Sequence, residues 1–249
     1  MAHTYAILGA TGGIGREIAT RLAGAGHRLA IAAQTPDKLD ALKAELGDAA
    51  VHAKPFDATQ PGEVESFIAE SAETLGSLDG IVNAVGSVIV KPAHLTSDDE
   101  FEKTLRLSLW TSFGVTRAAA KTMRKSGGSV VLFATAAARA GLPSHEAIAA
   151  AKGGVIGLTQ SAAATYATNG IRFNCIAPGL VETPGTTQLT ENETARKASE
   201  AMHPTGRIGT PADIAPAALW LLDPANTWTT GQVIGIDGGL GTLRGRVKM

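Results

Sequence analysis

The stretch Tyr5-Ala-Ile-Leu-Gly-Ala-Thr-Gly-Gly-Ile-Gly15 decides the fold of this chain. Its apolar start predicts a strand at Tyr5–Leu8, and a helix is predicted from Ile14 to Ala25, ending at Gly26. The glycines between them let the backbone turn and approach a pyrophosphate, which the N–H groups and dipole of the helix N-terminus favour. The sequence therefore predicts a phosphate-binding loop, made of Gly9, Thr11, Gly12, Gly13, Ile14 and Gly15.

Strand-like and helix-like stretches continue to alternate after this loop. Further strands are predicted at Arg28–Ala33, Val51–Pro55, Leu78–Asn83, Ser129–Ala134, Ile171–Ala177 and Gln232–Asp237, with helices at Asp37–Leu46, Pro61–Leu75, Ser97–Lys125, through Lys152 to Thr168, and at Pro211–Leu222. Seven strands separated by helices imply a parallel, doubly wound sheet with helices on both faces and right-handed crossovers. We therefore predict one α/β domain of the Rossmann type over residues 1–249.

The composition is typical of a globular protein with a sizeable core, at 249 residues and 44% hydrophobic content. A net charge of −1 recruits neither nucleic acid nor an anionic membrane, and the three charges of the tail Leu243–Lys248 are too few to bind nucleic acid. No apolar run approaches the roughly 18 residues of a membrane span, and no signal segment opens the chain. The one cysteine, Cys175, is expected to be a buried structural thiol. We expect a cytoplasmic protein.

The longest irregular stretch covers residues 179–209. It holds proline and threonine-proline breaks and a short polar piece of helix at residues 191–202. Such a length inside a compact domain indicates a functional lid over a substrate rather than a domain boundary. His203 falls within this lid, where it could touch a substrate, although a solvated surface position is expected for it.

Six features in order along the chain resemble the short-chain dehydrogenase/reductase family. They are the glycine spacing, Asp57 after the third strand, Asn83-Ala-Val-Gly86 after the fourth, Lys152, Pro178-Gly179 with Thr183, and Ile236-Asp-Gly-Gly239. The resemblance covers essentially the whole chain. It implies a Rossmann domain that binds NAD or NADP, transfers hydride to or from a small molecule, and assembles as a homotetramer through its long fourth and fifth helices.

The resemblance also implies where the cofactor would lie. Asp57 and Ala58 would sit beside the adenine, Asn83, Ala84 and Gly86 would flank the adenosine ribose, Lys152 would bind the nicotinamide ribose, and Pro178, Gly179, Val181 and Thr183 would cradle the nicotinamide amide and phosphates. Read locally, Asp57 can instead begin a turn and Asn83 can cap a strand end. Members of the family that prefer NAD place an acid after the second strand, and those that prefer NADP place a base there or in the glycine loop. Ala33 and Gln34 supply neither, so the choice between NAD and NADP stays open; Gln34 with Asp37-Lys-Leu resembles certain NADH-using enoyl-thioester reductases of the superfamily.

The family's usual catalytic residues are asparagine, serine, tyrosine and lysine. The tyrosine gives a proton to the substrate oxygen, and the lysine one helical turn away lowers the phenol's pKa. Here Lys152 is retained, Thr135 stands at the serine position and Ser108 at the asparagine position. The tyrosine position holds Ile148, which can neither give nor take a proton.

A replacement proton donor is offered by His145, seven residues before Lys152. Enoyl-thioester reductases of the superfamily place their tyrosine at that spacing, and Pro143-Ser-His-Glu-Ala-Ile148 resembles the corresponding segment. Histidine is a competent donor near neutral pH. We therefore hypothesise that His145 acts as the acid, with Glu146 as second choice; the alternative is that His145 only caps the helix on an exposed loop.

Two classes of function follow from these residues. The first is an oxidoreductase with a non-standard proton donor, acting on a carbonyl or, since the phenol is missing, on a conjugated C=C bond of a small molecule. The second is a catalytically impaired dinucleotide-binding protein that serves as a sensor or a stabilising subunit. No histidine pair has the spacing of metal ligands, so no metal site is predicted. Trp110 and Trp220 are expected to be packing residues.

Overall fold

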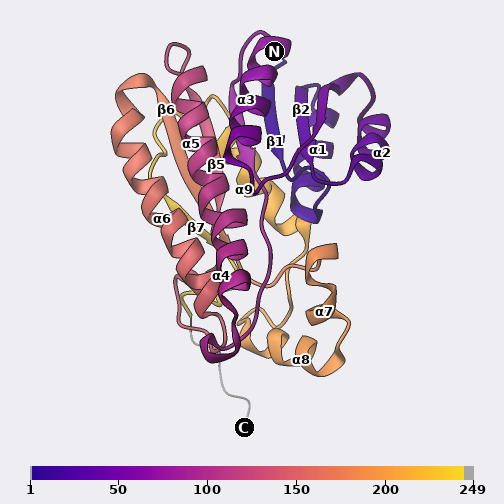
Figure 1. Ribbon diagram of the computed structural model, residues 1–249, viewed down its shortest axis with the longest axis vertical. Helices are drawn as coiled ribbons and strands as arrows, with labels where there is room; N and C mark the ends of the chain where they lie inside the picture. Colours follow the sequence, from indigo (N-terminus) through magenta and orange to yellow (C-terminus); the bar gives the residue numbers. More distant parts are fainter. Residues whose placement is uncertain (1, 244–249) are drawn as a thin grey trace.

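The computed structural model describes residues 2–243, whose strands form one seven-stranded sheet with helices on both faces (Figure 1). All neighbouring strands are parallel, in the order β3-β2-β1-β4-β5-β6-β7. The predicted fold class is therefore confirmed. The strand order reverses between β1 and β4, and in open α/β sheets ligands bind outside the carboxyl ends of the strands at such a reversal.

The strands are β1 (Thr4–Leu8), β2 (Arg28–Ala33), β3 (Ala50–Pro55), β4 (Gly80–Asn83), β5 (Gly128–Phe133), β6 (Ile171–Pro178) and β7 (Val233–Ile236). The helices are α1 (Gly13–Gly24), α2 (Pro36–Leu46), α3 (Pro61–Leu75), α4 (Asp98–Leu105), α5 (Thr111–Thr122), α6 (Glu146–Tyr166), α7 (Thr187–Thr190), α8 (Glu193–Met202) and α9 (Pro211–Leu222). Within residues 2–243, none of these helices combines the length and apolarity needed to traverse a bilayer. Of the basic tail Leu243–Lys248, residues 244–248 lie outside the described part of the chain.

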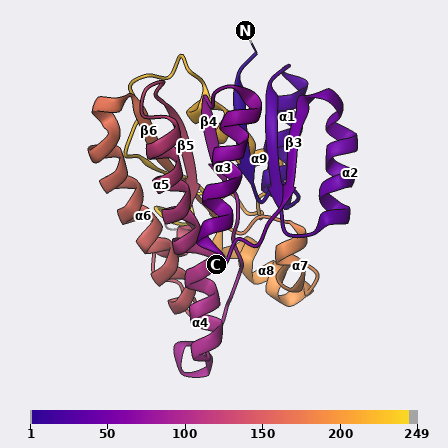
Figure 2. The ribbon, with the colours of Figure 1, turned by 45° about the horizontal axis from the view of Figure 1, so that its top comes forward.

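Two hydrophobic cores sandwich the sheet, because successive residues of a strand point to opposite faces. In β1, Tyr5 and Ile7 pack with apolar side chains of α1, α2 and α9, whereas Ala6 and Leu8 pack with those of α3, α5 and α6. Figure 2 shows α3, α5 and α6 on one face of the sheet and α1 and α9 on the other. Burial on both faces explains why the strands appear in the sequence as nearly continuous apolar runs.

The predicted single helix Ser97–Lys125 is wrong in its middle. Residues Arg106–Trp110 form a π-helical segment between α4 and α5, and α5 ends at Thr122. The Thr111 hydroxyl, which lies 2.9 Å from both the Arg106 carbonyl oxygen and the Ala58 carbonyl oxygen, marks the segment's end. π-Helical segments are frequent at functional sites, and this one carries Ser108.

The stretch predicted as a lid lies beyond the carboxyl ends of the strands, where Figure 1 shows α7 and α8 in orange. The polar helical piece expected at residues 191–202 corresponds to α8, whose first turn is capped by the Asn192 side chain. The short helix α7 before it was not predicted. Trp110 and Trp220 are about half exposed, so the packing expected for them is not made within the described chain.

Candidate functional site

The glycine loop packs directly against the loop after β4. The register pairs Leu8 with Asn83, so Gly9 and Ala84 leave the sheet side by side. Gly9 adopts a φ of 75°, and a Cβ there would lie 2.8 Å from the Ala84 carbonyl carbon. A Cβ at Gly15 would lie 2.3 Å from the Gly9 carbonyl oxygen. Only glycine fits these two positions, and the backbone N–H groups at the start of α1 face no capping side chain, because the N-cap residue is Gly12.

The segment after β6 reaches the same loop. A Cβ on Gly13 would lie 2.7 Å from the Thr183 Cγ2 atom, which places Thr183 in contact with the glycine loop. Val181 is buried and pairs with Gly209 in an isolated bridge. Pro178 ends β6, and the Gly179 N–H donates to the Ile236 carbonyl oxygen at 3.3 Å. The structure thus brings together the predicted phosphate loop and the predicted nicotinamide segment.

The residues predicted to lie near the adenine follow β2 and β3. Gln34 is exposed directly after β2. Asp57 accepts hydrogen bonds from the hydroxyl and the backbone N–H of Thr59, at 2.7 and 2.9 Å, and these bonds hold the pKa of its carboxyl below the ordinary value. Ala58 is buried. The contacts of Asp57 within the chain are those of a turn before α3, and its place beside an adenine stays a prediction.

Asn83 connects the end of β4 to the π-helical segment. Its amide nitrogen donates to the Ser112 hydroxyl at 3.1 Å, and the Ser112 hydroxyl donates to the Ser108 carbonyl oxygen at 2.7 Å. The Ser108 hydroxyl oxygen is itself buried and has no hydrogen-bond partner within residues 2–243. Sequence reasoning missed Ser112, because only the fold brings α5 against Asn83.

Lys152 is a buried residue of α6, with its amine turned to the sheet. Nζ donates to the Phe133 carbonyl oxygen at 2.8 Å, and a Cβ on Gly86 would lie 3.5 Å from Nζ. Burial lowers the pKa of Lys152 to about 8, and the interaction with Cys175 opposes this shift. Burial also raises the pKa of the Cys175 thiol to about 11, in agreement with the predicted structural thiol.

This buried amine makes stability depend on pH. The ordinary pKa of lysine is 10.5, so between pH 8 and pH 10.5 the unfolded chain binds more protons at this site than the folded chain does. The contribution of Lys152 to stability therefore rises with pH across that window. Cys175, whose pKa is raised, contributes with the opposite sign.

We expect the Lys152→Met variant to lack the increase in stability with pH that the lysine contributes. Urea midpoints of wild type and variant, measured at about pH 7.5, 9 and 10, isolate the lysine, because Cys175 is common to both proteins. The urea midpoint of wild type should increase relative to that of the variant as the pH increases. A difference that is the same at all three pH values would show that the amine titrates normally.

Ile148 occupies the position one helical turn before Lys152. Its side chain is only 5% exposed, so an apolar group fills the place expected for a phenol. Thr135 follows β5 and is half-buried. Its hydroxyl oxygen accepts the Ala137 N–H at 3.3 Å, which leaves the hydroxyl proton available for donation.

His145 stands at the N-cap of α6, but its side chain does not cap the helix. Nδ1 lies 2.7 Å from the Pro143 carbonyl oxygen, and because a carbonyl only accepts, Nδ1 carries the proton and Nε2 is the site left for proton exchange. Ser144 has a φ of 64°, the one positive value at a non-glycine residue in the described chain, and its carbonyl accepts the Lys91 N–H at 2.7 Å. Such strain persists where surrounding contacts impose it. No hydrogen bond joins His145 to Thr135 or Lys152 within residues 2–243.

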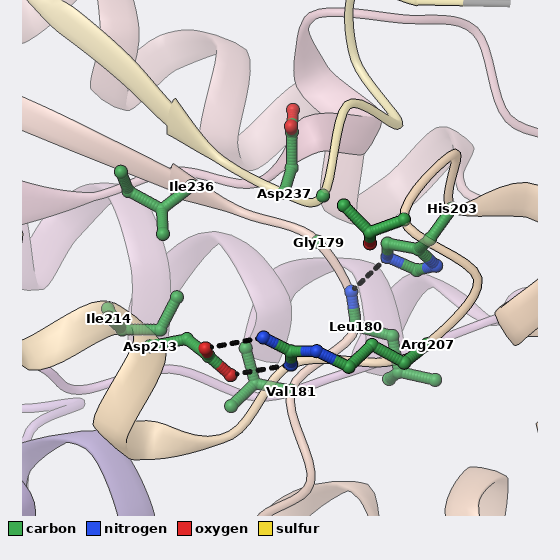
Figure 3. Close-up of a pocket in the computed structure, with 12 residues that line it drawn as sticks. Gly179, Leu180, Val181, His203, Arg207, Asp213, Ile214, Ile236 and Asp237 are labelled. Atoms are coloured by element: carbon green, nitrogen blue, oxygen red, sulfur yellow. Dashed lines mark hydrogen bonds and ion pairs between the residues drawn. The ribbon is translucent and has the colours of Figure 1, made fainter. Parts of the chain in front are cut away.

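The solvated surface position predicted for His203 is wrong, because its side chain is only 3% exposed. It borders a cavity of ≈ 170 Å³ at the base of the lid, between the ends of β6 and β7 and the start of α9 (Figure 3). Arg207 and Asp213 form a bidentate pair on the same cavity, at 2.7 and 2.8 Å, which holds the pKa of Asp213 well below its ordinary value. No local pattern signals this burial, because Gly179, far away in the sequence, makes the room for the imidazole.

Comparison with known proteins gives matches over nearly the full chain. The family model described as enoyl-(acyl carrier protein) reductase matches residues 9–241. The 2-(S)-hydroxypropyl-CoM dehydrogenase 3 of Xanthobacter autotrophicus is 31% identical over 96% of each chain. A second protein of that organism, named inactive 2-(S)-hydroxypropyl-CoM dehydrogenase 2, is 34% identical over 79% of this chain and 87% of its own.

Solved structures match the fold closely. A short-chain type dehydrogenase/reductase from Mycobacterium ulcerans superposes with a TM-score of 0.90 at 31% identity, covering 98% of this chain and 91% of that one. The structure of ElxO with NADP bound superposes with a TM-score of 0.89 at 26% identity, covering 96% and 99%.

Proposed function

The chain belongs to the short-chain dehydrogenase/reductase family, and from that membership we propose that it is an NAD(P)-dependent oxidoreductase acting on a small molecule. The observation that carries the proposal is the glycine loop at the reversal of strand order. Gly9 and Gly15 have no room for a Cβ, because the loop is folded against itself and against the end of β4. This close packing lets backbone N–H groups of α1 approach a pyrophosphate.

The residues around the loop fit a dinucleotide. We propose that the glycine loop and Thr183 hold the phosphates, that Asp57 and Ala58 lie beside the adenine, and that Asn83 to Gly86 flank the adenosine ribose. Pro178, Gly179 and Val181 would line the nicotinamide, and the Lys152 amine would bind its ribose. When bound, the nicotinamide supplies or accepts the hydride. The match to a structure with NADP bound supports this class of cofactor, and the lack of an acid or base at Gln34 is compatible with either NAD or NADP.

The protein's own residues would bind the substrate oxygen and supply the proton. We propose that the Thr135 hydroxyl donates a hydrogen bond to the substrate oxygen and that His145, protonated on both ring nitrogens, gives its Nε2 proton to that oxygen and becomes the neutral Nδ1–H imidazole. The Nδ1–H bond to the Pro143 carbonyl keeps the imidazole in one orientation throughout. Ser108, buried in the π-helical segment with an unpartnered hydroxyl, is proposed to hold a water that connects the site to solvent. With Ile148 in place of a phenol, a C=C bond conjugated to a carbonyl is the favoured substrate group. The enolate oxygen would take its proton from His145, and the α-carbon would take one from solvent as the enol returns to the carbonyl form and releases the proton on oxygen.

The surface beside His145 favours an apolar substrate. Val88 and Val90 are exposed on the segment that leads from β4 to Lys91. The Lys91 N–H donates a hydrogen bond to the carbonyl oxygen of Ser144, the residue before His145. We propose that residues 179–209 form the lid over this surface.

We propose a homotetramer, supported by the exposed side chains of Phe101 in α4, Trp110 in the π-helical segment and Phe113 in α5, which leave apolar area for a neighbouring subunit. A cytoplasmic location is proposed from the single, buried thiol of Cys175.

The function is tested by titrating the protein with NADH and with NADPH and then following loss of the reduced nicotinamide with a panel of ketones, aldehydes and α,β-unsaturated carbonyl compounds. We expect saturable binding of at least one dinucleotide, with an affinity between about 1 μM and 1 mM, and turnover of an unsaturated acceptor. Failure to bind either dinucleotide would overturn the proposal.

A second candidate, a dinucleotide-binding protein without turnover, is favoured by the buried Ile148 and by the relative named inactive. It predicts binding of the dinucleotide with no reaction of any acceptor. Turnover that arises only in the Ile148→Tyr variant would favour this second candidate.

A further inference from the structure

His203 is a buried imidazole at the end of lid helix α8, and both of its ring nitrogens are engaged. Nδ1 lies 2.6 Å from the Ser199 carbonyl oxygen, so Nδ1 carries the proton. Nε2 accepts the backbone N–H of Leu180 at 3.2 Å. The first contact stays within α8, whereas the second joins the end of α8 to the backbone directly after β6, where the lid begins (Figure 3).

A glycine makes room for this contact, because a Cβ on Gly179 would lie 2.4 Å from the His203 Nε2 atom. Gly238 also borders the ring, where a Cβ would be in ordinary contact with Cδ2 at 3.5 Å. The chain after His203 is also docked on the sheet, since the Thr205 N–H donates to the Gly238 carbonyl oxygen at 3.2 Å. The base of the lid therefore rests on the ends of β6 and β7.

The charged groups around the cavity do not compete for the imidazole. Arg207 and Asp213 are paired with each other, and the Asp237 carboxylate accepts the N–H groups of Gly239 and Gly241. The partners of His203 are consequently backbone atoms only, one in α8 and one in the segment directly after β6.

The segment that His203 holds is the one proposed to line the nicotinamide. The Gly179 N–H donates to the Ile236 carbonyl oxygen in β7, and the Glu182 N–H donates to the Gly209 carbonyl oxygen. The Leu180 N–H between them donates to a side chain, the imidazole of His203. We propose that His203 is a positioning residue, whose Nε2 contact fixes α8, the helical part of the lid, against the nicotinamide segment after β6 in one arrangement. Loss of that contact loosens the lid and weakens cofactor binding together. The effect on the cofactor rests on the proposed function.

Two substitutions separate the two contacts. In His203→Gln, the side-chain oxygen can take the place of Nε2 and accept the Leu180 N–H. In His203→Asn, the amide can take the place of Nδ1 and donate to Ser199, but it leaves the Leu180 N–H unpaired. Because an unpaired buried donor costs about a factor of ten or more in an equilibrium, we expect the dissociation constant for NADPH or NADH to rise about tenfold in Asn and to stay within about threefold of wild type in Gln.

A second measurement needs no cofactor. Hydrogen exchange at the Leu180 amide and tryptic cleavage in α8, after Arg196 or Lys197, are compared in wild type and both variants. We expect both rates to increase in Asn and to stay near wild type in Gln. Thermal melts show whether each variant is folded, and the Gln variant alone tests the Nε2 contact if Asn does not fold.

Equal behaviour of the two variants, whether both resemble wild type or both are impaired alike, would overturn the positioning role and leave His203 as a filler of the cavity. A different result is that the Asn and Gln variants differ in hydrogen exchange and tryptic cleavage, while the wild-type protein binds neither NADH nor NADPH. That result would support the positioning role of His203 and overturn the proposed function instead.

Discussion

Replacing His145 by alanine is expected to lower kcat about 100-fold, because a positioned general acid typically contributes between about 100-fold and 10,000-fold to the rate. Cofactor affinity should stay within about twofold of wild type, since His145 lies outside the glycine loop and the segment after β6. Steady-state kinetics on the acceptor found in the panel, together with dinucleotide titration, separate the two effects.

Three variants sharpen this assignment. His145→Gln keeps a polar side chain without a titrating group and should be as slow as the alanine variant. Glu146→Gln, at the adjacent exposed position, should react at nearly the wild-type rate; if it fails and His145→Ala does not, the proton donor is Glu146. Addition of Ile148→Tyr to His145→Ala should restore part of the lost rate for a carbonyl substrate. Unchanged turnover in His145→Ala would refute the role of this residue.

Replacing Gly15 by alanine is expected to weaken dinucleotide binding by more than about 100-fold, which corresponds to roughly 3 kcal/mol. The added Cβ would lie 2.3 Å from the Gly9 carbonyl oxygen, and this backbone atom cannot move without shifting the whole loop. Titration with NADH and NADPH measures the loss.

Gly24 supplies a matched control in the same helix. A Cβ there meets no atom within 4 Å, so Gly24→Ala should bind the dinucleotide like wild type. It should also raise the melting temperature slightly, because alanine is favoured over glycine in helices by up to about 1 kcal/mol. Thermal melts of both variants distinguish a distorted loop from a general loss of fold. Wild-type affinity in Gly15→Ala would argue against a phosphate site at this loop.

The strands and most helices could be predicted from the sequence because their signals are local. Each buried parallel strand is a short apolar run, and proline or glycine marks the start or end of helices such as α2 and α3. The π-helical segment Arg106–Trp110 could not be predicted in this way. Its residues suit an ordinary helix, and its shape is accompanied by a hydrogen bond from Thr111 to Ala58, 53 positions away.

The candidate site divides along the same line. The glycine loop could be predicted because strand, glycines and helix follow one another directly in the chain. The surroundings of His203 could not, since they combine the end of α8 with Gly179 and Gly238 from two different strand ends. The direction of the Lys152 amine, towards the Phe133 carbonyl, likewise depends on how α6 lies on β5.

The π-helical segment also changes the phase of the helix that contains it. An α-helix has 3.6 residues per turn, so one surplus residue rotates every later side chain by about 100°. The faces of α4 and α5 are therefore offset, and only with this offset do Thr111 and Ser112 meet Ala58 and Asn83. Deletion of a single residue between positions 106 and 110 would restore a regular helix and turn both hydroxyls away from the sheet. At this place in the chain, the number of residues matters as much as their identity.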